Sequence, residues 1–419
     1  MTLTQCYMQT GDYSKALDTC EEGFSTTIKR NKGFLIPDFA HHKALCLANL
    51  GQSNDAISFL RQAYFGYSLL RRHTKAADLL QYANSEMGIQ IETYGTDMLQ
   101  LPLQEFRFVY DGVNACTSVG ELIAAFRCDT GLTLEQLCEG ICTKSTLNKI
   151  ENGTIQGNVY ILEALFEQLG RDINKYLNTF LSSDEFKNKQ IRDEINALLS
   201  NWKYDKAEEM LKLLEHEKHY KERVGLQFIE LSKATIYRFK ANCDPSMRLE
   251  MLKNTLSITK KNFDLRYVAT TRLTYYEILI INQIANILCN AEETRHRGMR
   301  LFEDLVESMN TFYTDETAKI RMYTTVLYNY SKFLGMAKRY NDALLVIDDG
   351  EELCLKHGQI KTLPGFIINR ACILHEQGRN KESFPYFAQT FYCYALIGKL
   401  KNMEDIRSYV SKHFELDFD

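Results

Sequence analysis

The stretch LTLEQLCEGICTKSTLNKIENG, residues 132–153, contains two short helical patterns joined by a tight turn. Thr133 can cap the first helix, because its hydroxyl can accept a bond from the amide three residues on, and Gln136 can return that bond. Gly140 then ends the helix at a position where a left-handed backbone costs glycine least. The second helix spans about 144–152. This arrangement predicts a helix-turn-helix motif.

The residues on either side of this motif complete a small helical domain. An upstream helix over 120–128 and a downstream helix over 159–169 carry apolar residues at helical spacing. Leu147 and Ile150 of the second helix would pack against them. We therefore expect residues 116–181 to form a helix-turn-helix domain, and such domains usually bind DNA.

The motif resembles the lambda-repressor-like (XRE) helix-turn-helix, in which a Leu-Thr-x-x-x-Leu … Ser-x-Ile-Glu-Asn-Gly pattern recurs. Its turn is one residue tighter than in most such motifs, and in this it is similar to the RRNPP family of regulators. In that family a helix-turn-helix precedes tetratricopeptide (TPR)-like helix pairs that bind a short signalling peptide. The resemblance covers roughly residues 115–419 in architecture, and only the helix-turn-helix is specific in sequence.

Length and composition favour a helical, intracellular protein. The chain has 419 residues, five prolines and a net charge of −4, so its overall charge gives no sign of nucleic-acid binding. Its twelve cysteines are scattered along helical patterns and are expected to be reduced packing residues. We see no signal peptide and no apolar run long enough for a membrane span, so we expect a cytoplasmic protein with no membrane partner.

An internal repeat relates the two ends of the chain. Residues 1–92 align without a gap on residues 328–419, at a constant offset of 327, and the shared positions include Pro37 with Pro364 and Gly51 with Gly378. Each copy follows the helix, turn, helix pattern of stacked helical repeats. Residues 1–92 are interpreted as the tail of an array whose front half is absent, through duplication and truncation or through permutation.

The expected domain map follows from these patterns. It consists of a partial TPR-like unit over 1–92, a linker over 93–115, the XRE-type helix-turn-helix domain over 116–181 and a TPR-like array over 185–419. The array should contain about five helix pairs and a terminal helix. The expected fold class is therefore all-α, with a helix-turn-helix domain flanked by helical-repeat arrays of the α-solenoid type.

The exposed face of the second motif helix is the expected DNA-binding surface. Side chains of this kind can contact base edges, and the lysines can neutralise phosphates. The candidate residues are Arg127, Thr143, Lys144, Ser145, Thr146, Asn148 and Lys149. Two features oppose DNA binding: Leu134 replaces a residue that is usually polar in this family, and residues 117–180 carry a net charge of about −3. A merely solvated or protein-binding face is the alternative.

Asparagines at helical spacing form a candidate peptide site. Asn282, Asn286 and Asn290 are four residues apart, so they share one face of a helix. An amide side chain can donate to and accept from the backbone of an extended peptide, which is the use that the family resemblance implies. Asn329 and Asn369 could extend the row, and Arg266, Arg272 and Arg321 could meet a peptide carboxylate. The alternatives are helix capping, solvated surface or bonding between helices.

No metal, cofactor or catalytic site is predicted. Cys138 and Cys142 lack a second Cys or His pair at zinc spacing, and His216 and His219 lack further ligands at a fixed spacing. The chain has no phosphate-binding glycine loop, nucleophile elbow or paired catalytic carboxylates, so an enzyme such as a phosphatase is disfavoured.

The favoured function is a cytoplasmic transcriptional regulator that binds double-stranded DNA and a short peptide or protein segment. A homodimer is expected because such motifs bind two half-sites about one helical turn apart. The alternative is a TPR protein-interaction scaffold whose helix-turn-helix no longer binds DNA.

Overall fold

The computed structural model of the chain consists of helices and the turns that join them, without a strand in the part of the chain that it describes. The described residues are 1–29, 33–96, 118–173, 183–215, 220, 222–240, 242–414 and 418. The all-α class expected from the sequence is confirmed for these residues. None of their helices is both long enough and apolar enough to cross a membrane.

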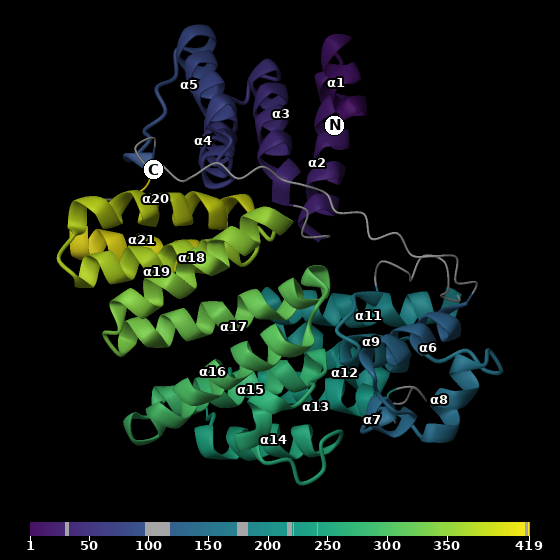
Figure 1. Cartoon of the computed structure of the whole chain (residues 1–419). Coiled ribbons are helices and arrows are strands. Elements are labelled where there is room, and N and C mark those ends of the chain that lie inside the picture. Colours follow the sequence, from purple (N-terminus) through teal and green to yellow (C-terminus); the bar gives the residue numbers. More distant parts are fainter. Residues whose placement is uncertain are drawn as a thin grey trace. The chain divides into compact units, whose positions relative to one another are not determined.

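Contacts between the helices divide the chain into two units (Figure 1). The first combines Met1–Phe108 with Leu334–Asp419, and the second is Val109–Phe333. The sequence places residues 185–419 in one array, whereas the contacts assign the C-terminal part of that range to the first unit. The reason is that the two ends of the chain pack against each other, as the helix pairs of the first unit show below.

The second unit contains the helix-turn-helix domain and most of the array. The domain comprises α6 (Val119–Thr130), α7 (Leu134–Cys138), α8 (Lys144–Glu151) and α9 (Val159–Gln168). The array continues with α11 (Ser183–Ser200), α12 (Tyr204–Leu214), α13 (Arg223–Tyr237), α14 (Pro245–Ser257), the 3-10 turn η5 (Leu265–Thr270), α15 (Tyr275–Asn290), η6 (Glu292–Thr294) and α16 (Arg295–Phe312). The long helix α17 (Glu316–Met336) crosses from the second unit into the first.

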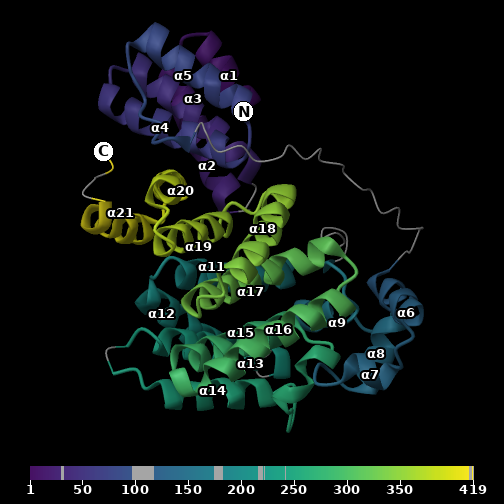
Figure 2. The ribbon, with the colours of Figure 1, turned by 60° about the vertical axis from the view of Figure 1, so that its left-hand side comes forward.

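The first unit contains the helices of both chain ends. From the N-terminal end come α1 (Thr2–Gln9), α2 (Tyr13–Lys29), η1 (Gly33–Leu35), α3 (Ile36–Asn49), α4 (Ser53–Leu69) and α5 (His73–Met87). From the C-terminal end come α18 (Tyr340–His357), α19 (Leu363–Glu376), α20 (Asn380–Leu396) and α21 (Leu400–Phe414). Within this unit α4 packs against α20, and Figure 2 shows both helices.

The helices of the two ends begin and end at positions related by the offset of 327 residues. This holds for both bounds of α3 and α19 and of α4 and α20, and for the start of α5 and α21. A proline near the start of α3 and of α19, where its missing N–H is not needed, helps to fix the start of each helix.

Close packing is repeated together with the helix bounds. A Cβ on Gly23 would lie 2.5 Å from the ring of Phe39, and a Cβ on Gly350 would lie 2.3 Å from the ring of Phe366. These pairs occupy equivalent positions, and in both of them only glycine lets the ring approach the neighbouring helix. The two segments therefore share local packing as well as helix boundaries.

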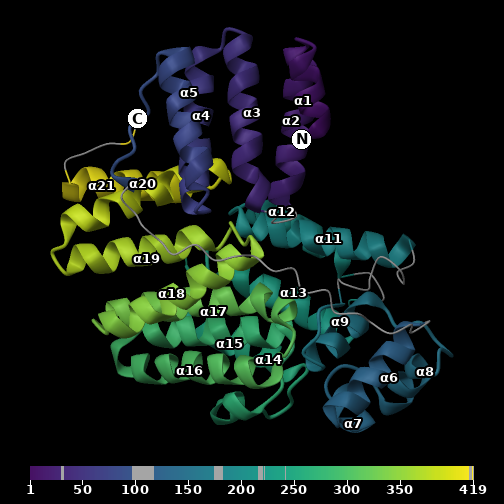
Figure 3. The same cartoon turned by 45° about the horizontal axis from the view of Figure 1, so that its top comes forward.

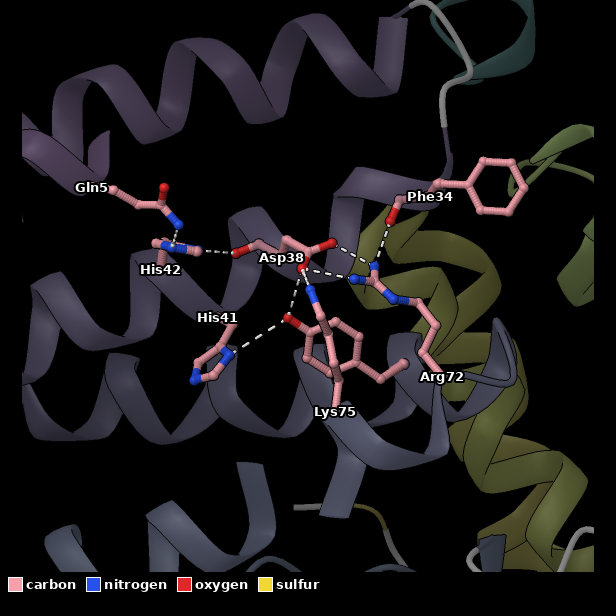
Figure 4. A network of polar contacts seen from close by, with 8 residues as sticks. Gln5, Phe34, Asp38, His41, His42, Arg72 and Lys75 are labelled. Carbon is pink, nitrogen blue, oxygen red and sulfur yellow. Dashed lines mark hydrogen bonds and ion pairs between the residues drawn. The ribbon is translucent and has the colours of Figure 1, made fainter. Parts of the chain in front are cut away.

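A polar network centred on Asp38 lies in the N-terminal copy (Figure 4). The buried carboxylate of Asp38 on α3 forms ion pairs with Arg72 and Lys75, and the Tyr67 hydroxyl donates to it at 3.2 Å. Arg72 also donates to the carbonyl of Phe34 at 2.7 Å. The position equivalent to Asp38 in the C-terminal copy is Gly365, which has no carboxylate. The ion pairs that link α3 to α5 are therefore specific to the N-terminal copy.

Candidate nucleic-acid interface and candidate peptide site

The two helices of the motif, α7 and α8, are labelled in Figure 3, and local capping fixes where each begins. The capping box predicted from the sequence is confirmed: Gln136 N donates to the Thr133 hydroxyl at 3.2 Å, and the Gln136 side chain accepts from Thr133 N at 2.8 Å. Thr143 caps α8, since its hydroxyl accepts from Thr146 N at 3.1 Å. Gly140 has a φ of +75°, as the turn between the helices requires.

The outer face of α8 is polar and open to solvent. Leu147 and Ile150 lie in the core, which orients the opposite face outward. Lys144, Ser145, Asn148 and Lys149 are exposed, as is the capping residue Thr143, and Thr146 is half-buried. These are the residues that the sequence predicts to contact DNA, and α8 presents them on one short helix.

The two lysines of α8 differ in their surroundings. Lys144 forms an ion pair with Glu135 of α7, which lowers the pKa of that carboxyl through a hydrogen bond and a charge interaction. In the described structure no carboxylate pairs with Lys149. Lys149 is therefore the cation on this face that is most available to a phosphate.

Arg127 of α6 is held inside the domain. Its Nε donates to Glu151 at 2.7 Å, a second guanidinium nitrogen donates to the same carboxylate at 2.9 Å, and a third contact reaches the carbonyl of Leu132 at 3.1 Å. The hydrogen bonds and charge of Glu151 raise the pKa of the guanidinium. Arg127 thus braces α6 against the end of α8, in addition to any contact with DNA.

Helix α9 joins the helix-turn-helix domain to the array through buried charges. Glu163 is 5% exposed and forms a two-point ion pair with Arg192 of α11, which is 0% exposed. Burial raises the pKa of Glu163, but the charge and hydrogen bonds of Arg192 outweigh burial and leave it below its ordinary value. One turn further along α9, Glu167 accepts from Tyr275 N at 2.9 Å.

Further bonds strengthen this joint on both sides of α9. Asn158 donates to Glu222 of the array at 2.7 Å, and Asp315 N donates to the carbonyl of Gly170 at 3.2 Å. A Cβ on Gly140 would lie 2.3 Å from the Thr259 carbonyl, so the turn of the motif also touches the array. The helix-turn-helix domain is therefore docked onto the array in this structure.

A small recess lies at this joint. Its lining residues are Tyr160, Glu163, Ala164, Glu167, Val224, Tyr275, Tyr276 and Arg321. Arg321 is exposed and lies 3.9 Å above the Tyr275 ring. Burial raises the pKa of Glu167 to about 7, although the positive charge of Arg321 opposes this shift. Three ionisable groups, Glu163, Glu167 and Arg321, thus meet where the domain and the array join.

The asparagines of the predicted peptide site are partly engaged with each other. Asn329 of α17 donates to the buried side-chain oxygen of Asn282 on α15 at 3.1 Å, which bridges the two helices. Asn286 donates to the Asn282 carbonyl at 2.7 Å, and Asn290 donates to the Asn286 carbonyl at 2.8 Å. Asn282 is buried, Asn286 is half-buried and Asn290 is exposed, so the row runs from the core to solvent.

The two remaining predicted peptide-site residues belong to other segments of the chain. Asn369 is on α19 in the first unit, whereas the other asparagines belong to the second. Arg272 donates to the carbonyl of Gln168 at 3.1 Å and stacks on Phe312 at 4.8 Å, so it is part of the α9 joint. Asn282, Asn286, Asn290 and Asn329 are the residues that the structure brings together.

The charged side chains of α9 at this joint were not predicted from the sequence. Glu163 and Glu167 lie four residues apart on an otherwise apolar helix, and charges in such a place signal buried partners. The partner Arg192 could not be identified from that pattern, because it lies in another helix.

No group of His, Cys, Asp and Glu in the described residues could hold a metal ion. Burial raises the pKa of the Cys138 thiol and raises that of Cys142 to about 12, which disfavours the thiolates that bind metal. His216 and His219 lie outside the described residues.

Comparison with known families gives one extended match in sequence. The model of the RNPP family C-terminal domain matches residues 192–406. These residues run from Arg192, the buried arginine of the α9 joint, into α21. No curated protein matches the chain.

Three solved structures of peptide receptors resemble the chain at low identity. PlcR of Bacillus thuringiensis in complex with the peptide PapR7 and DNA is 21% identical, with 70% of this chain and 99% of that chain covered and a TM-score of 0.46. ComR from S. thermophilus with DNA and its signalling peptide ComS is 16% identical, with coverages of 70% and 98% and a TM-score of 0.38. The Streptococcus dysgalactiae SHP pheromone receptor Rgg2 is 15% identical, with coverages of 71% and 99% and a TM-score of 0.38.

Proposed function

The chain belongs to the RNPP family, and on that premise we propose that it is a DNA-binding transcriptional regulator whose helical array binds a short signalling peptide. It acts in the cytoplasm, as a regulator and not as an enzyme, on double-stranded DNA. The observation that carries the proposal is the outward polar face of α8 on a domain that is docked to the matched array. Recognition of two half-sites would require a homodimer.

The DNA-binding face consists of Ser145, Asn148 and Lys149, with Lys144 at its edge. Asn148 can bond an adenine edge, and Lys149 can neutralise a phosphate or bond a guanine. A lysine that only contacts phosphate increases the affinity for every DNA sequence equally. The asparagine, which contacts a base, makes the affinity depend on the DNA sequence.

The test is a DNA-binding titration of the full chain against genomic fragments over a range of salt concentrations. We expect Lys149→Ala to weaken binding and to reduce the slope of log affinity against log salt by about one. Lys206→Ala, which removes an exposed lysine from α12, is the matched control and should leave the slope unchanged. If both variants change the DNA affinity and its salt dependence equally, α8 is not part of the DNA interface.

The peptide-binding surface is proposed to lie along α15 and α17, next to the recess. Asn286 is half-buried, and its side-chain oxygen accepts no bond from the described residues, so it can accept from a peptide backbone N–H. Arg321, which is exposed above Tyr275, can bind a peptide carboxylate.

This surface can be tested with a pool of short synthetic peptides and the full chain. Asn286→Ala should weaken the binding of a captured peptide by about tenfold, because it leaves a desolvated peptide group without a partner. Asn254→Ala on α14, an exposed asparagine away from the recess, is the control. Unchanged binding by Asn286→Ala would exclude this surface.

In the proposed mechanism the peptide acts through α9. A peptide that contacts α15 and α17 adjoins Glu167 and Tyr275, so it can shift the population between docked and undocked helix-turn-helix domains. Only a peptide with different affinities for the two states can do so.

The alternative function is a protein-interaction scaffold. It is favoured by the net charge of about −3 over residues 117–180 and by the engagement of Lys144 with Glu135. Failure of the full chain to bind any genomic fragment at low salt, with peptide present and absent, would establish this alternative in place of DNA binding.

A further inference from the structure

The two repeat copies meet through equivalent helices. The aromatic rings of Phe65 on α4 and Tyr392 on α20 are stacked, with centroids 4.2 Å apart and planes inclined by 5°. These two residues occupy the same position in their copies, because they are 327 residues apart. A residue therefore contacts its own equivalent across the contact between the copies.

A second contact has the same property. Gly33 N donates to the carbonyl of Gly358 at 3.0 Å, and a Cβ on Gly33 would lie 2.7 Å from the Cβ of Ile360. Gly33 and Ile360 also occupy equivalent positions. Two such self-equivalent contacts, one between α4 and α20 and one between η1 and the turn after α18, are characteristic of two copies related by a twofold axis.

This arrangement differs from a continued helical array. In a solenoid each unit stacks on the next through different faces, so equivalent residues do not meet. In a twofold pair both copies use the same face, and residues on the axis face their own equivalents. In the contact between α4 and α20 equivalent residues do face each other, as in a twofold pair.

Burial shows that this face is a complete interface. Residues 63–69 of α4 are buried without interruption, as are residues 387–394 of α20. A helix at the end of a repeat buries one side and leaves the other to solvent. Here each helix is also covered by the other copy, and the Cys393 thiol donates to the Phe65 carbonyl at 3.9 Å.

We propose that the α20 face is a self-complementary pairing surface for a second copy of this chain, and that residues 1–96 occupy it in cis as a built-in second copy. The covalent connection makes this pairing intramolecular, so it outcompetes a second chain. The homodimer that recognition of two half-sites requires must then use another face. The inference does not depend on DNA or peptide binding.

One substitution between the copies explains why the cis pair is preferred. A Cβ on Gly66 would lie 2.8 Å from Leu396 across the interface and 2.8 Å from Pro37 of its own copy, so glycine at position 66 lets both side chains approach α4 closely. The equivalent position in the C-terminal copy is Cys393. In a pair of two α20 faces Leu396 would meet this larger side chain, and the pair would be packed less closely.

The proposal is tested by the mass of the full chain in solution, measured by sedimentation velocity. Phe65→Asp places a charge against Tyr392 and frees the α20 face, so the mass should become twice that of the wild type, with a dependence on protein concentration. Phe65→Asp combined with Tyr392→Asp blocks both faces and should return the mass to the wild-type value. Ser58→Asp, on the exposed side of α4, adds the same charge as a control and should leave the mass unchanged.

A milder variant covers the case in which Phe65→Asp does not fold, as judged by circular dichroism. Gly66→Cys gives the N-terminal copy the residue of the C-terminal copy, and it should shift part of the protein to the doubled mass. The proposal is overturned if a folded Phe65→Asp keeps the wild-type mass, or if Phe65→Asp is unfolded and Gly66→Cys keeps it. It is also overturned if the double variant associates as strongly as Phe65→Asp.

Discussion

Asp38 is a buried carboxylate that depends on its neighbours for its charge. Burial raises its pKa, but Arg72 and Lys75 outweigh burial through hydrogen bonds and charge, and the pKa lies below its ordinary value of 3.8. A carboxyl whose pKa is lowered by folding contributes stability above its unfolded pKa and loses it as the pH falls through the folded pKa. The network of Figure 4 should therefore stabilise the first unit at neutral pH and fail in acid.

Asp38→Asn is expected to lower the free energy of unfolding at neutral pH by about 2 kcal/mol, less than the ~3–5 kcal/mol for fully buried pairs, because Lys75 is half exposed. The difference from the wild type should shrink as the pH falls below about 4. Urea unfolding over a pH series measures both effects. Asp55→Asn, an exposed carboxyl on α4, is the control, and an equal loss of stability in it would contradict the role of the network.

The pKa of Glu167 is shifted in the opposite direction from that of Asp38, so its contribution to stability depends on pH in the opposite way. Burial raises its pKa from 4.5 to about 7, so the folded state favours the protonated carboxyl. Its contribution to stability is complete below the unfolded pKa and is lost as the pH rises through about 7. Glu163 cannot cause a change in this range, because its pKa is lowered and it titrates in acid.

We therefore expect the wild type to lose on the order of 1–3 kcal/mol of stability between about pH 5 and pH 8, relative to Glu167→Gln. The amide in this variant cannot titrate, yet it can still accept from Tyr275 N. Denaturant unfolding at several pH values gives the comparison. A Glu139→Gln variant, at an exposed position after α7, is the control and should show the same pH dependence of stability as the wild type. If the stability of Glu167→Gln depends on pH as that of the wild type does, the prediction is wrong.

At the scale of helices, features that depend on neighbouring residues follow from the sequence. The capping box of Thr133 and Gln136 needs only side chains three residues apart, and it is confirmed. The proline of each copy places the start of α3 and of α19 at the same position, because proline suits the first turn of a helix. Periodicity and capping therefore predict where these helices lie.

Partners that lie far apart in the chain do not follow from the sequence. Arg127 meets Glu151 across 24 residues, and Glu163 meets Arg192 across 29. No periodic pattern specifies such partners, because they depend on how helices pack. The residues named for DNA and peptide contact stay predictions for the same reason.

Arg127 provides a test at this scale. Arg127→Ala should lower the melting temperature by several degrees, because it leaves the nearly buried Glu151 carboxylate without its cation. If bracing is its main role, the dependence of DNA affinity on salt should stay unchanged, in contrast to Lys149→Ala. Thermal unfolding and the salt titration measure the two effects. A reduced salt slope together with an unchanged melting temperature would identify Arg127 as a phosphate contact.

At the scale of the whole molecule, function depends on how the repeat copies pack together and how the helix-turn-helix domain packs on the array. The repeat was visible in the sequence, but an alignment cannot tell stacked copies from copies paired about a twofold axis. The stacking of Phe65 on Tyr392 and the contact of Gly33 with Ile360 distinguish the two arrangements. The docking of the helix-turn-helix domain was equally hidden, since it depends on α9 and its buried charges.

If α9 joins the domain to the array, weakening its contacts should change the stability of docking and the coupling between peptide and DNA binding. Glu163→Gln leaves the fully buried Arg192 without its counter-charge, so the docked state should become less stable by about 3 kcal/mol or more. Amide hydrogen exchange should then become faster in α9 and at the start of α11, while α4 and α20 keep their protection.

The coupling between sites supplies a second readout of the same variant. Peptide and DNA must change each other's affinity by the same factor, because the coupling free energy is reciprocal. In Glu163→Gln this factor should move toward one, since the docked state that the peptide acts on is less populated. Glu194→Gln on α11, an exposed carboxyl two residues from Arg192, is the matched control. Unchanged exchange in α9 together with unchanged coupling would show that docking rests on contacts other than this ion pair.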